Sequence, residues 1–473
     1  MHKQKLLLHI FPCILFVVLL CGVVHIIGDK PPTSDAREYV TMGYNFLKHN
    51  TFSLENKVDP TPTAYREPGM PTYDALTIAA IAQLRDMDLD TLLAKGPGPR
   101  ILKYAQLPII ALTAVLTMYI VFMLTRNIFY GYTALFLTGF STSLLYAANN
   151  LCAEHLAALL ILCVSLFLYK AVKEKSIKYF VLLGAALGLL VLTRGVFQYF
   201  IVIILAFLVF LAIVGAFEKR KLLICTIIFS VAYFALAGSW MVRNYIHFGR
   251  LFITERGCKV LLLRAETNIM NTKEYLGAFL YWAPDKYLSE SLLKHFLGQD
   301  AIKPGGALER LNRQNDSSFY LRTKAIWTKL EKELGGQAGN TIVDKKLKSM
   351  AKTKILKHPF RHILVTLPIG WRGLFAEHGY RLKIPGSGIV INSSVPTNIV
   401  YFAALFFLAF LSVKKRWWDL FAFILPALYL YGIQTFLTHN LARYNKPLIP
   451  TLVVALLFVV HYLINKRAIP EKS

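Results

Sequence analysis

The sequence predicts an all-α polytopic membrane protein, a bundle of about ten transmembrane helices with juxtamembrane helices in its outer loops. Hydrophobic residues make up 55% of the 473 positions and the mean hydropathy is +0.48. Charged residues account for only 17%, against about 25% in soluble domains. Apolar runs recur at the length a helix needs to cross a bilayer, and short basic clusters separate them.

The apolar runs set the predicted spans. The first, 6–27, is longer than the apolar part of a signal peptide and lacks a small-residue cleavage site, so we expect a retained helix. The ten predicted spans are 6–27, 101–125, 131–149, 151–170, 178–193, 196–217, 221–241, 397–413, 417–436 and 445–465. Segments 70–84 and 361–375 are apolar but short and interrupted, and we expect them to be juxtamembrane or re-entrant helices.

The short basic clusters set the predicted orientation. They all fall on one side if the ten runs cross the membrane and the two interrupted segments do not. The positive-inside rule then places both chain ends in the cytoplasm and the loops 28–100 and 242–396 outside it. The net charge of +26 is assigned to this orientation and to anionic lipid, not to nucleic acid, because no basic groove interleaved with aromatic residues is present.

The same pattern divides the chain into three parts. Residues 1–241 form an N-terminal transmembrane bundle that includes the first outer loop, 28–100. Residues 242–396 form a large outer region with juxtamembrane helices, one of them predicted over 320–337. Residues 397–473 carry the last transmembrane helices. The six cysteines have no spacing typical of a zinc site or a disulfide framework, and no Walker or Rossmann motif occurs.

The first outer loop contains two motifs with ionisable residues. "SDAREYVTMGYNFL" predicts a helix that begins near Asp35 and carries Tyr39 on its apolar face, and "YREPGMP" presents Arg66 and Glu67 on a rigid turn. The structural alternatives are a capping box formed by Asp35 with Glu38 and an ordinary loop with a solvated ion pair.

Further ionisable residues fall at the outer ends of later spans. "NNLCAEHL" contains Glu154 and His155, and "VLTRGVF" contains Arg194. "SWMVRNYIHFGRLFITERG" contains Arg243. "HNLARYNKPLIP" contributes Arg443, Tyr444 and Lys446. Taken singly, each is also explained by an interfacial acid, a structural histidine or a snorkelling cation.

Together these residues place two acids and four arginines at one membrane face. Arginines neutralise a phosphate and stabilise it as a leaving group, whereas a carboxylate accepts the proton of an attacking hydroxyl. We therefore expect Asp35 to be the general base, with Glu154 supporting the acceptor or a metal. The expected phosphate ligands are Arg66, Arg194, Arg243 and Arg443. Further expected substrate contacts are Tyr39, Glu67, His155, Tyr444 and Lys446.

These motifs, in this order, resemble the GT-C superfamily of membrane glycosyltransferases, near the protein O-mannosyltransferases and lipid A aminoarabinose transferases. The matching elements are "DAREYVTMGYNFL", "YREPGMP", "NNLCAEHL", "LTRG", "WMVRNYIHFGRLFIT" and "ARYNKPLIP". In this family Asp35 matches the first-loop acid and Glu154 the second acid. Arg66 falls where relatives often have a basic residue or a proline. Ala36 after the first acid and Glu67 before Pro68 depart from the pattern, which leaves the metal requirement and the donor sugar open.

The resemblance implies a GT-C-like bundle and a hexosyl or pentosyl transferase. It would move one sugar, with inversion, from an undecaprenyl or dolichyl phosphate to a hydroxyl of a lipid, glycan or protein. No cofactor is certain, and a divalent metal, Mg²⁺ or Mn²⁺, held by Asp35 and Glu154 stays open. We expect a bacterial inner membrane with a periplasmic site. The alternatives are a flippase for lipid-linked saccharides, a polymerase or ligase with a diphosphate-linked donor, and a non-catalytic scaffold.

Overall fold

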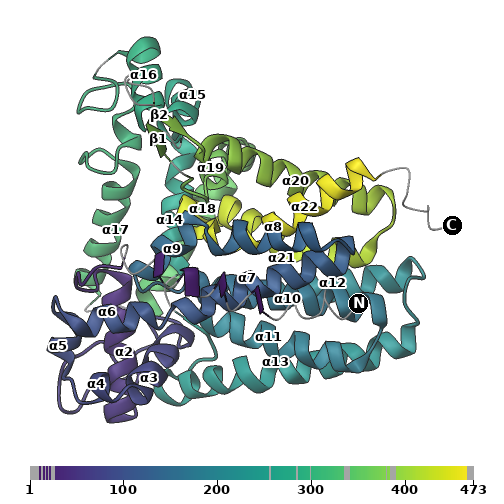
Figure 1. Ribbon diagram of the computed structural model, residues 1–473. Coiled ribbons are helices and arrows are strands. Elements are labelled where there is room, and N and C mark those ends of the chain that lie inside the picture. Colours follow the sequence, from purple (N-terminus) through teal and green to yellow (C-terminus); the bar gives the residue numbers. More distant parts are fainter. Residues whose placement is uncertain are drawn as a thin grey trace.

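The computed structural model describes residues 27–254, 257–283, 286–298, 300–334, 341–379, 381–383 and 390–465, with scattered residues between 10 and 22. Long apolar helices run side by side across the molecule (Figure 1). The α12–α13 connection and the end of α22 lie at one end of this bundle, and α2–α5, α14, α17 and α18 gather at the other (Figure 1). The chain is an integral, multi-pass, all-α membrane protein, as predicted.

Within the described residues, eight helical segments are long and apolar enough to cross a membrane, and each overlaps a predicted span. They are 97–125 (α6, Pro97–Tyr104, and α7, Leu107–Thr125), 128–149 (α8, Ile128–Gly139, and α9, Thr142–Asn149), α10 (Glu154–Glu174), 195–213 (η1, Gly195–Tyr199, and α12, Phe200–Ile213), α13 (Lys219–Phe248), α20 (Ser394–Lys414), α21 (Trp418–Leu437), and 442–464 (η4, Ala442–Leu448, and α22, Ile449–Ile464).

Two predicted spans stand apart from these eight. The predicted span 178–193 appears as α11 (Ile177–Thr193), an apolar helix of 17 residues. The predicted span 6–27 falls largely outside the described residues. The boundary proposed at residue 241 lies inside α13, so the three-part division of the chain stays a prediction.

The first outer loop folds into short helices at one end of the bundle. They are α2 (Asp35–His49), α3 (Gly69–Ala80), α4 (Ala82–Arg85) and α5 (Leu89–Leu93). The interrupted segment 70–84 thus forms α3 and most of α4. Neither helix is among the candidate spans. Gly43 of α2 lets α3 approach closely, since a Cβ there would lie 2.6 Å from the carbonyl oxygen of Pro71.

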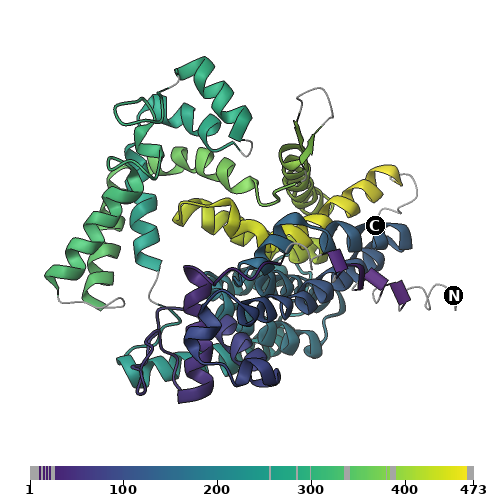
Figure 2. The same cartoon turned by 60° about the vertical axis from the view of Figure 1, so that its left-hand side comes forward.

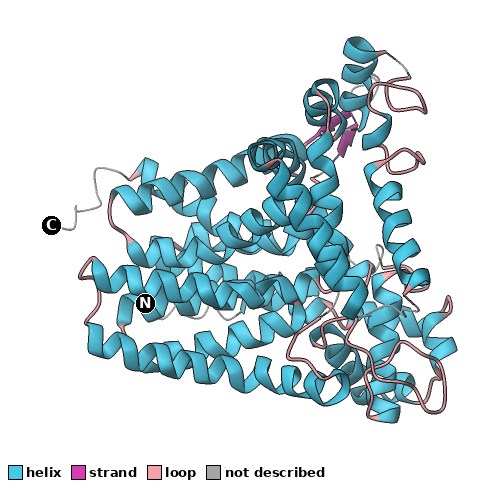
Figure 3. Ribbon diagram, turned by 180° about the vertical axis from the view of Figure 1, so that it is seen from behind, coloured by secondary structure: helices cyan, strands magenta, loops and turns pink. Residues whose placement is uncertain are grey.

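The large outer region adds a second group of helices, drawn in teal to green in Figure 2. They are α14 (Gly257–Glu266), η2 (Thr267–Ile269), α15 (Thr272–Tyr281), α16 (Lys286–Leu297), η3 (Glu309–Leu311), α17 (Phe319–Glu333), α18 (Thr341–Lys357) and α19 (Pro359–Leu374). α17 confirms the helix predicted over 320–337, although 335–337 lie outside the described residues. β1 (Arg381–Lys383) and β2 (Val390–Asn392) pair antiparallel, with Leu382 opposite Ile391 (Figure 3).

Buried polar contacts fasten this second group to the bundle. Arg264 of α14 is fully buried: its Nη2 donates to the carbonyl oxygen of His362 on α19 at 2.7 Å, and its Nε donates to the carbonyl oxygen of Thr435 in α21 of the bundle at 3.4 Å. Glu377, after α19, accepts from the backbone nitrogen of Ser143 at 3.0 Å, at the start of α9. An unpaired buried polar group is costly, so these partners fix where the outer helices lie relative to the bundle.

Two glycines bring α11 against α13. A Cβ at Gly184 would lie 2.4 Å from the carbonyl oxygen of Phe229, and one at Gly188 would lie 2.9 Å from Cβ of Leu236. Membrane helices gain most of their association energy from such close packing of small residues. The spacing of four residues places both glycines on one face of α11.

We predict that Gly184→Ala destabilises the protein by about 1–3 kcal/mol, because the added methyl group overpacks the α11–α13 contact. Thermal unfolding of the purified protein in detergent measures the change. Gly238→Ala in α13 is the matched control, since its Cβ would meet nothing closer than 3.7 Å. Equal unfolding temperatures for the two variants would contradict this account of the packing.

Candidate active site

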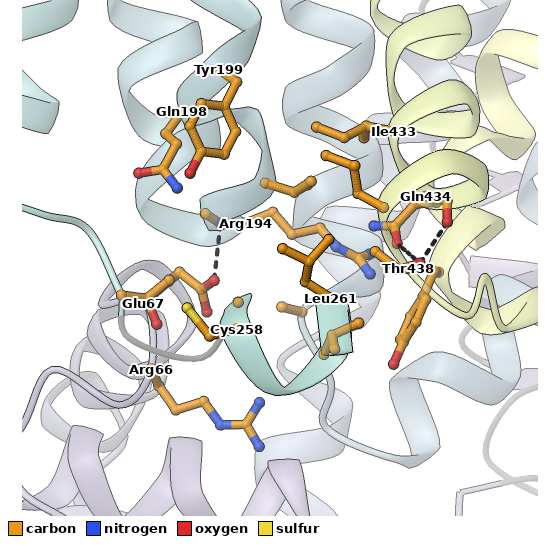
Figure 4. Close-up of a pocket in the computed structure, with 18 of the residues that line it drawn as sticks. Arg66, Glu67, Arg194, Gln198, Tyr199, Cys258, Leu261, Ile433, Gln434 and Thr438 are labelled. Carbon is orange, nitrogen blue, oxygen red and sulfur yellow. Dashed lines mark hydrogen bonds between the residues drawn. The ribbon is translucent and has the colours of Figure 1, made fainter. Parts of the chain in front are cut away.

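A cavity of about 620 Å³ lies at the end of the bundle where the two outer regions meet. Its wall is built from the start of α2, the 65–69 turn, the start of α10, η1, α14, α18, the end of α21 and η4. Figure 4 shows Arg66 and Glu67 on one side of this space and Gln434 and Thr438 on the other. Eight predicted site residues line it: Asp35, Tyr39, Arg66, Glu67, Glu154, Arg194, Arg443 and Tyr444.

The start of α2 holds the first acid. Ser34 is the N-cap residue and makes no side-chain capping hydrogen bond, while Asp35 is the first helical residue. The carboxylates of Asp35 and Glu38 instead both accept from Arg66. The proposed Asp35–Glu38 capping box is therefore wrong, because a buried guanidinium takes the oxygens that the cap would have used.

Arg66 is the most buried charged group of the cavity wall, with a side chain only 3% exposed. Its Nη2 donates to Oδ1 of Asp35 at 2.6 Å and its Nε donates to Glu38. The guanidinium also lies over the rings of Tyr39 and Tyr65, 5.3 and 5.5 Å from their centroids. Burial alone would lower the pKa of Arg66, but Tyr39, Asp35 and Glu38 outweigh it and raise that pKa.

Arg443, from the far end of the chain, completes the cluster around Asp35. Its Nη2 donates to Oδ2 of Asp35 at 3.1 Å, so each carboxylate oxygen meets a different guanidinium. Burial opposes ionisation of Asp35, yet Arg66 and Arg443 together hold its pKa below the ordinary value. For Glu38, burial dominates over Arg66 and raises the pKa. The Arg443 side chain keeps 43% exposure and faces the cavity.

Glu154 is the first residue of α10 and also lines the cavity. It is half-buried, and no hydrogen bond or ion pair joins its carboxylate to another residue in the described part of the chain. A carboxylate at a helix N-terminus is favoured by the helix dipole. Unlike Asp35, Glu154 therefore presents free oxygen atoms to whatever occupies the cavity.

Arg194 lies between α11 and η1 and reaches into the cavity. Its guanidinium extends toward the wall formed by Gln434 and Thr438 (Figure 4). The buried Nη1 has no hydrogen-bond partner among the described residues. A buried guanidinium nitrogen without a partner is costly, so this position favours an anionic ligand.

Glu67 shapes the same turn from the other side. Its Oε1 accepts from the backbone nitrogen of Gly195 at 2.9 Å, the dashed contact beside Arg194 in Figure 4. A Cβ at Gly195 would lie 2.8 Å from that oxygen, so glycine is needed there. Glu67 thereby fixes the backbone that carries Arg194.

Three expected site residues do not line the cavity. Arg243 donates to the carbonyl oxygen of Thr63 at 2.9 Å and lies over the Trp240 ring, so it supports the first loop from α13. His155 is buried and hydrogen-bonded to Gln106. Lys446 is 6% exposed, with its ammonium 5.2 Å from the centroid of the Tyr146 ring.

The cavity also contains residues that the sequence patterns did not single out. Among them are Gln198, Tyr199, Arg250, Asp344, Lys345, Lys348, Gln434 and Thr438. Polar residues in the last turn of an apolar span were an available signal for Gln434 and Thr438. No local sequence pattern indicates that Asp344, Lys345 and Lys348 belong to the site. They line the cavity because α18 packs over it. Burial raises the pKa of Asp344 to about 6, against the opposing effect of Lys259 and Arg250.

The acids do not match the donor set of a divalent metal. Both oxygens of Asp35 are paired with guanidinium groups, which repel a cation. No group of three or more His, Cys, Asp or Glu residues gathers within the described residues. As they lie here, Asp35 and Glu154 do not form a metal site, and a divalent metal in this cavity stays a prediction.

No family model matches the chain, and no curated protein matches it by sequence. Among solved structures, the chain is similar to the archaeal oligosaccharyltransferase AglB of Archaeoglobus fulgidus in complex with an inhibitory peptide and a dolichol-phosphate. The two share 16% identity and a TM-score of 0.46, and the match covers 98% of this chain and 52% of that one. It is also similar to the Archaeoglobus fulgidus oligosaccharyltransferase tethered with an acceptor peptide, with 16% identity and a TM-score of 0.47 over 96% and 50%. A complex of that enzyme with Zn and sulfate gives 14% identity and 0.45 over 96% and 50%.

The chain spans about half the length of these structures. At such identities and scores, however, the likeness assigns neither a substrate nor a residue's role, and the chemistry has to follow from the cavity itself.

We predict that Arg66→Met lowers the free energy of unfolding by about 3–5 kcal/mol at pH 7.5, because it leaves two part-buried carboxylates without their shared cation. Without Arg66, burial raises the pKa of Glu38 further, so the folded state binds protons more readily than the unfolded one. The deficit should therefore shrink as the pH falls toward 5. Thermal unfolding across this pH range measures it, with exposed Arg100→Met as control. A deficit that does not change with pH would contradict the ion-pair account.

Proposed function

We propose that this protein is a membrane glycosyltransferase that moves one sugar from a polyprenyl phosphate to an acceptor hydroxyl. One observation carries the proposal. Three groups meet in the cavity at one end of the apolar bundle. Arg194 has a guanidinium nitrogen with no hydrogen-bond partner among the described residues, and the Arg443 guanidinium is partly exposed. The carboxylate of Glu154 has no partner among the described residues. This is the set of groups that a phosphate leaving group and an attacking hydroxyl require.

Arg194 and Arg443 are the proposed phosphate ligands. Arg194 lacks a carboxylate partner within the described residues, and Arg443 shares Asp35 with Arg66 while keeping 43% exposure. Arg66 is already engaged by two acids and almost fully buried, so it serves to hold Asp35 and not to bind phosphate directly. Arg243, on α13, supports the backbone of the first loop at Thr63 and does not bind phosphate either.

The geometry also changes the catalytic roles that were expected for the two acids. Asp35 was expected to be the general base, but two guanidinium groups occupy its oxygens and lower its pKa, which weakens it as a base. Glu154 lines the same cavity, and its oxygens have no partner among the described residues. We therefore assign Glu154 as the base and Asp35 as the residue that orients Arg443.

The proposed reaction balances without a cofactor. The acceptor oxygen forms a bond to the anomeric carbon as the bond from that carbon to the carrier's phosphate oxygen breaks. The bonding electron pair leaves with the phosphate, where Arg194 and Arg443 stabilise the added charge. Glu154 takes the proton of the acceptor hydroxyl. Attack from the side opposite the phosphate gives inversion at that carbon.

The rival functions fit the cavity less well. A transporter places its charged residues near the bilayer midplane, whereas these lie at one end of the bundle. A polymerase or ligase would use the same face with a diphosphate-linked donor. A comparison of labelled donors distinguishes such an enzyme from a transferase that uses a monophosphate-linked sugar. The proposed location of the cavity is the outer face of a bacterial inner membrane, in keeping with the basic clusters at the opposite end.

We predict that Glu154→Gln lowers kcat by at least about 100-fold with little change in the KM for the donor, because it removes only the proton acceptor. Asp35→Asn should lower kcat and also raise the KM for the donor, because Arg443 loses its anchor. Single-turnover and steady-state transfer assays measure both. Asp59→Asn, at an exposed acid of the same loop outside the cavity, is the control. Near-normal kcat in Glu154→Gln would remove the assignment of the base.

We predict that the purified protein transfers sugar from polyprenyl-phosphate monosaccharides only. Diphosphate-linked oligosaccharides and nucleotide sugars should give no product, because the two proposed phosphate ligands, Arg194 and Arg443, are suited to a single phosphate. The assay compares the three labelled donors at equal concentration with a membrane extract as the source of acceptor. Transfer from the diphosphate-linked donor alone would instead identify a ligase or polymerase.

A further inference from the structure

A second, apolar groove of about 260 Å³ lies between α3, α10 and α11. Its wall consists mainly of five leucines, namely Leu76, Leu156, Leu160, Leu189 and Leu192. No charged side chain of the described residues lines it. Sugars, nucleotides and peptides need polar partners, so the groove suits only an apolar occupant.

The groove begins where the cavity ends. Thr193 lines both spaces. Three chain segments also pass from one to the other, and in each the charged residue lines the cavity and its apolar neighbours line the groove. These segments are 66–69, 154–160 and 192–194. An elongated ligand with an anionic end and an apolar chain matches this arrangement.

Close contact between α3 and α11 keeps the two spaces adjacent. A Cβ at Gly69 would lie 2.5 Å from Oγ1 of Thr193 and 2.8 Å from the carbonyl oxygen of Leu192. Only glycine lets the start of α3 reach the end of α11 in this way. The first loop is thus positioned to form one wall of an apolar groove that the bundle alone would leave open.

The groove opens on the outside of the bundle. Leu76 and Leu189 line it and are 65% and 45% exposed, respectively. Leucines this exposed are suited to contact with lipid, whose chains are as apolar as leucine itself. A chain in the groove would therefore pass sideways into the bilayer between α3 and α11.

We propose that this groove holds the first isoprenyl units of the carrier lipid, with the phosphate at Arg194 and Arg443 and the rest of the chain in the bilayer. The inference rests on the proposed function and adds the path of the lipid. A two-chain phospholipid fits less well, because the groove holds only about 260 Å³ and adjoins a cavity in which Nη1 of Arg194 has no hydrogen-bond partner among the described residues. A nucleotide-linked donor would leave the groove without an occupant.

The test uses the purified full-length protein and a farnesyl phosphate that carries a diazirine in its second isoprenyl unit. After irradiation, we expect labelled peptides that contain Leu76, Leu156–Leu160 or Leu189. Leu189→Trp should weaken labelling by about tenfold, because the larger side chain fills the channel. Leu112→Trp, at a 55% exposed leucine of α7 outside the groove, should label like the parent protein. Excess farnesyl phosphate should compete, and inorganic phosphate should compete far less.

Three results would overturn the inference. Saturable labelling that maps to other helices, or that Leu189→Trp leaves unchanged, places the chain elsewhere. Equal labelling by a photoreactive phosphatidylglycerol makes the groove a site for bulk lipid. In each of these cases, transfer from a polyprenyl-phosphate sugar by the same preparation would leave the proposed function intact. Absence of both transfer and saturable labelling would remove the function and the groove together.

Discussion

The buried guanidinium of Arg66 is the interaction on which the rest of the site depends. It joins the start of α2 to the turn before α3, and through Asp35 it reaches Arg443 at the opposite end of the sequence. A buried cation needs compensating charge, and the two acids on the first turn of α2 supply it. Because one Asp35 oxygen is used in this way, the other is available to set the position of Arg443.

The bundle provides the platform for this ion cluster. Gly184 and Gly188 pack α11 against α13, which fixes the end of α11 and with it Arg194. Glu67 then holds the turn after Arg194 through the nitrogen of Gly195. The outer helices add a cover whose place is set by buried contacts of Arg264 and Glu377. Rigid helices thus present a polar cavity beside an apolar groove, a combination suited to a ligand with a charged head and a long apolar tail.

Sequence periodicity and length were sufficient to predict most of the fold, because a bilayer restricts what can cross it. The apolar runs that became α10, α13, α20 and α21 are visible without any tertiary information. The site was predicted in part, since acids and arginines at span ends are unusual enough to be singled out. Arg243, His155 and Lys446 looked equivalent to Arg194 by position, and only packing distinguishes a cation that supports a loop from one that faces a cavity. The contribution of α18 and the pairing of Arg66 with Asp35 and Glu38 depend on contacts between distant segments, which no local pattern encodes.

The most direct test of the central claim is an experimental structure of the protein with a bound polyprenyl phosphate. The account predicts phosphate oxygens at about 3 Å from the guanidinium groups of Arg194 and Arg443, with Glu154 across the space for the sugar from the phosphate. A phosphate bound away from both arginines, with Asp35 still paired to Arg66 and Arg443, would contradict it.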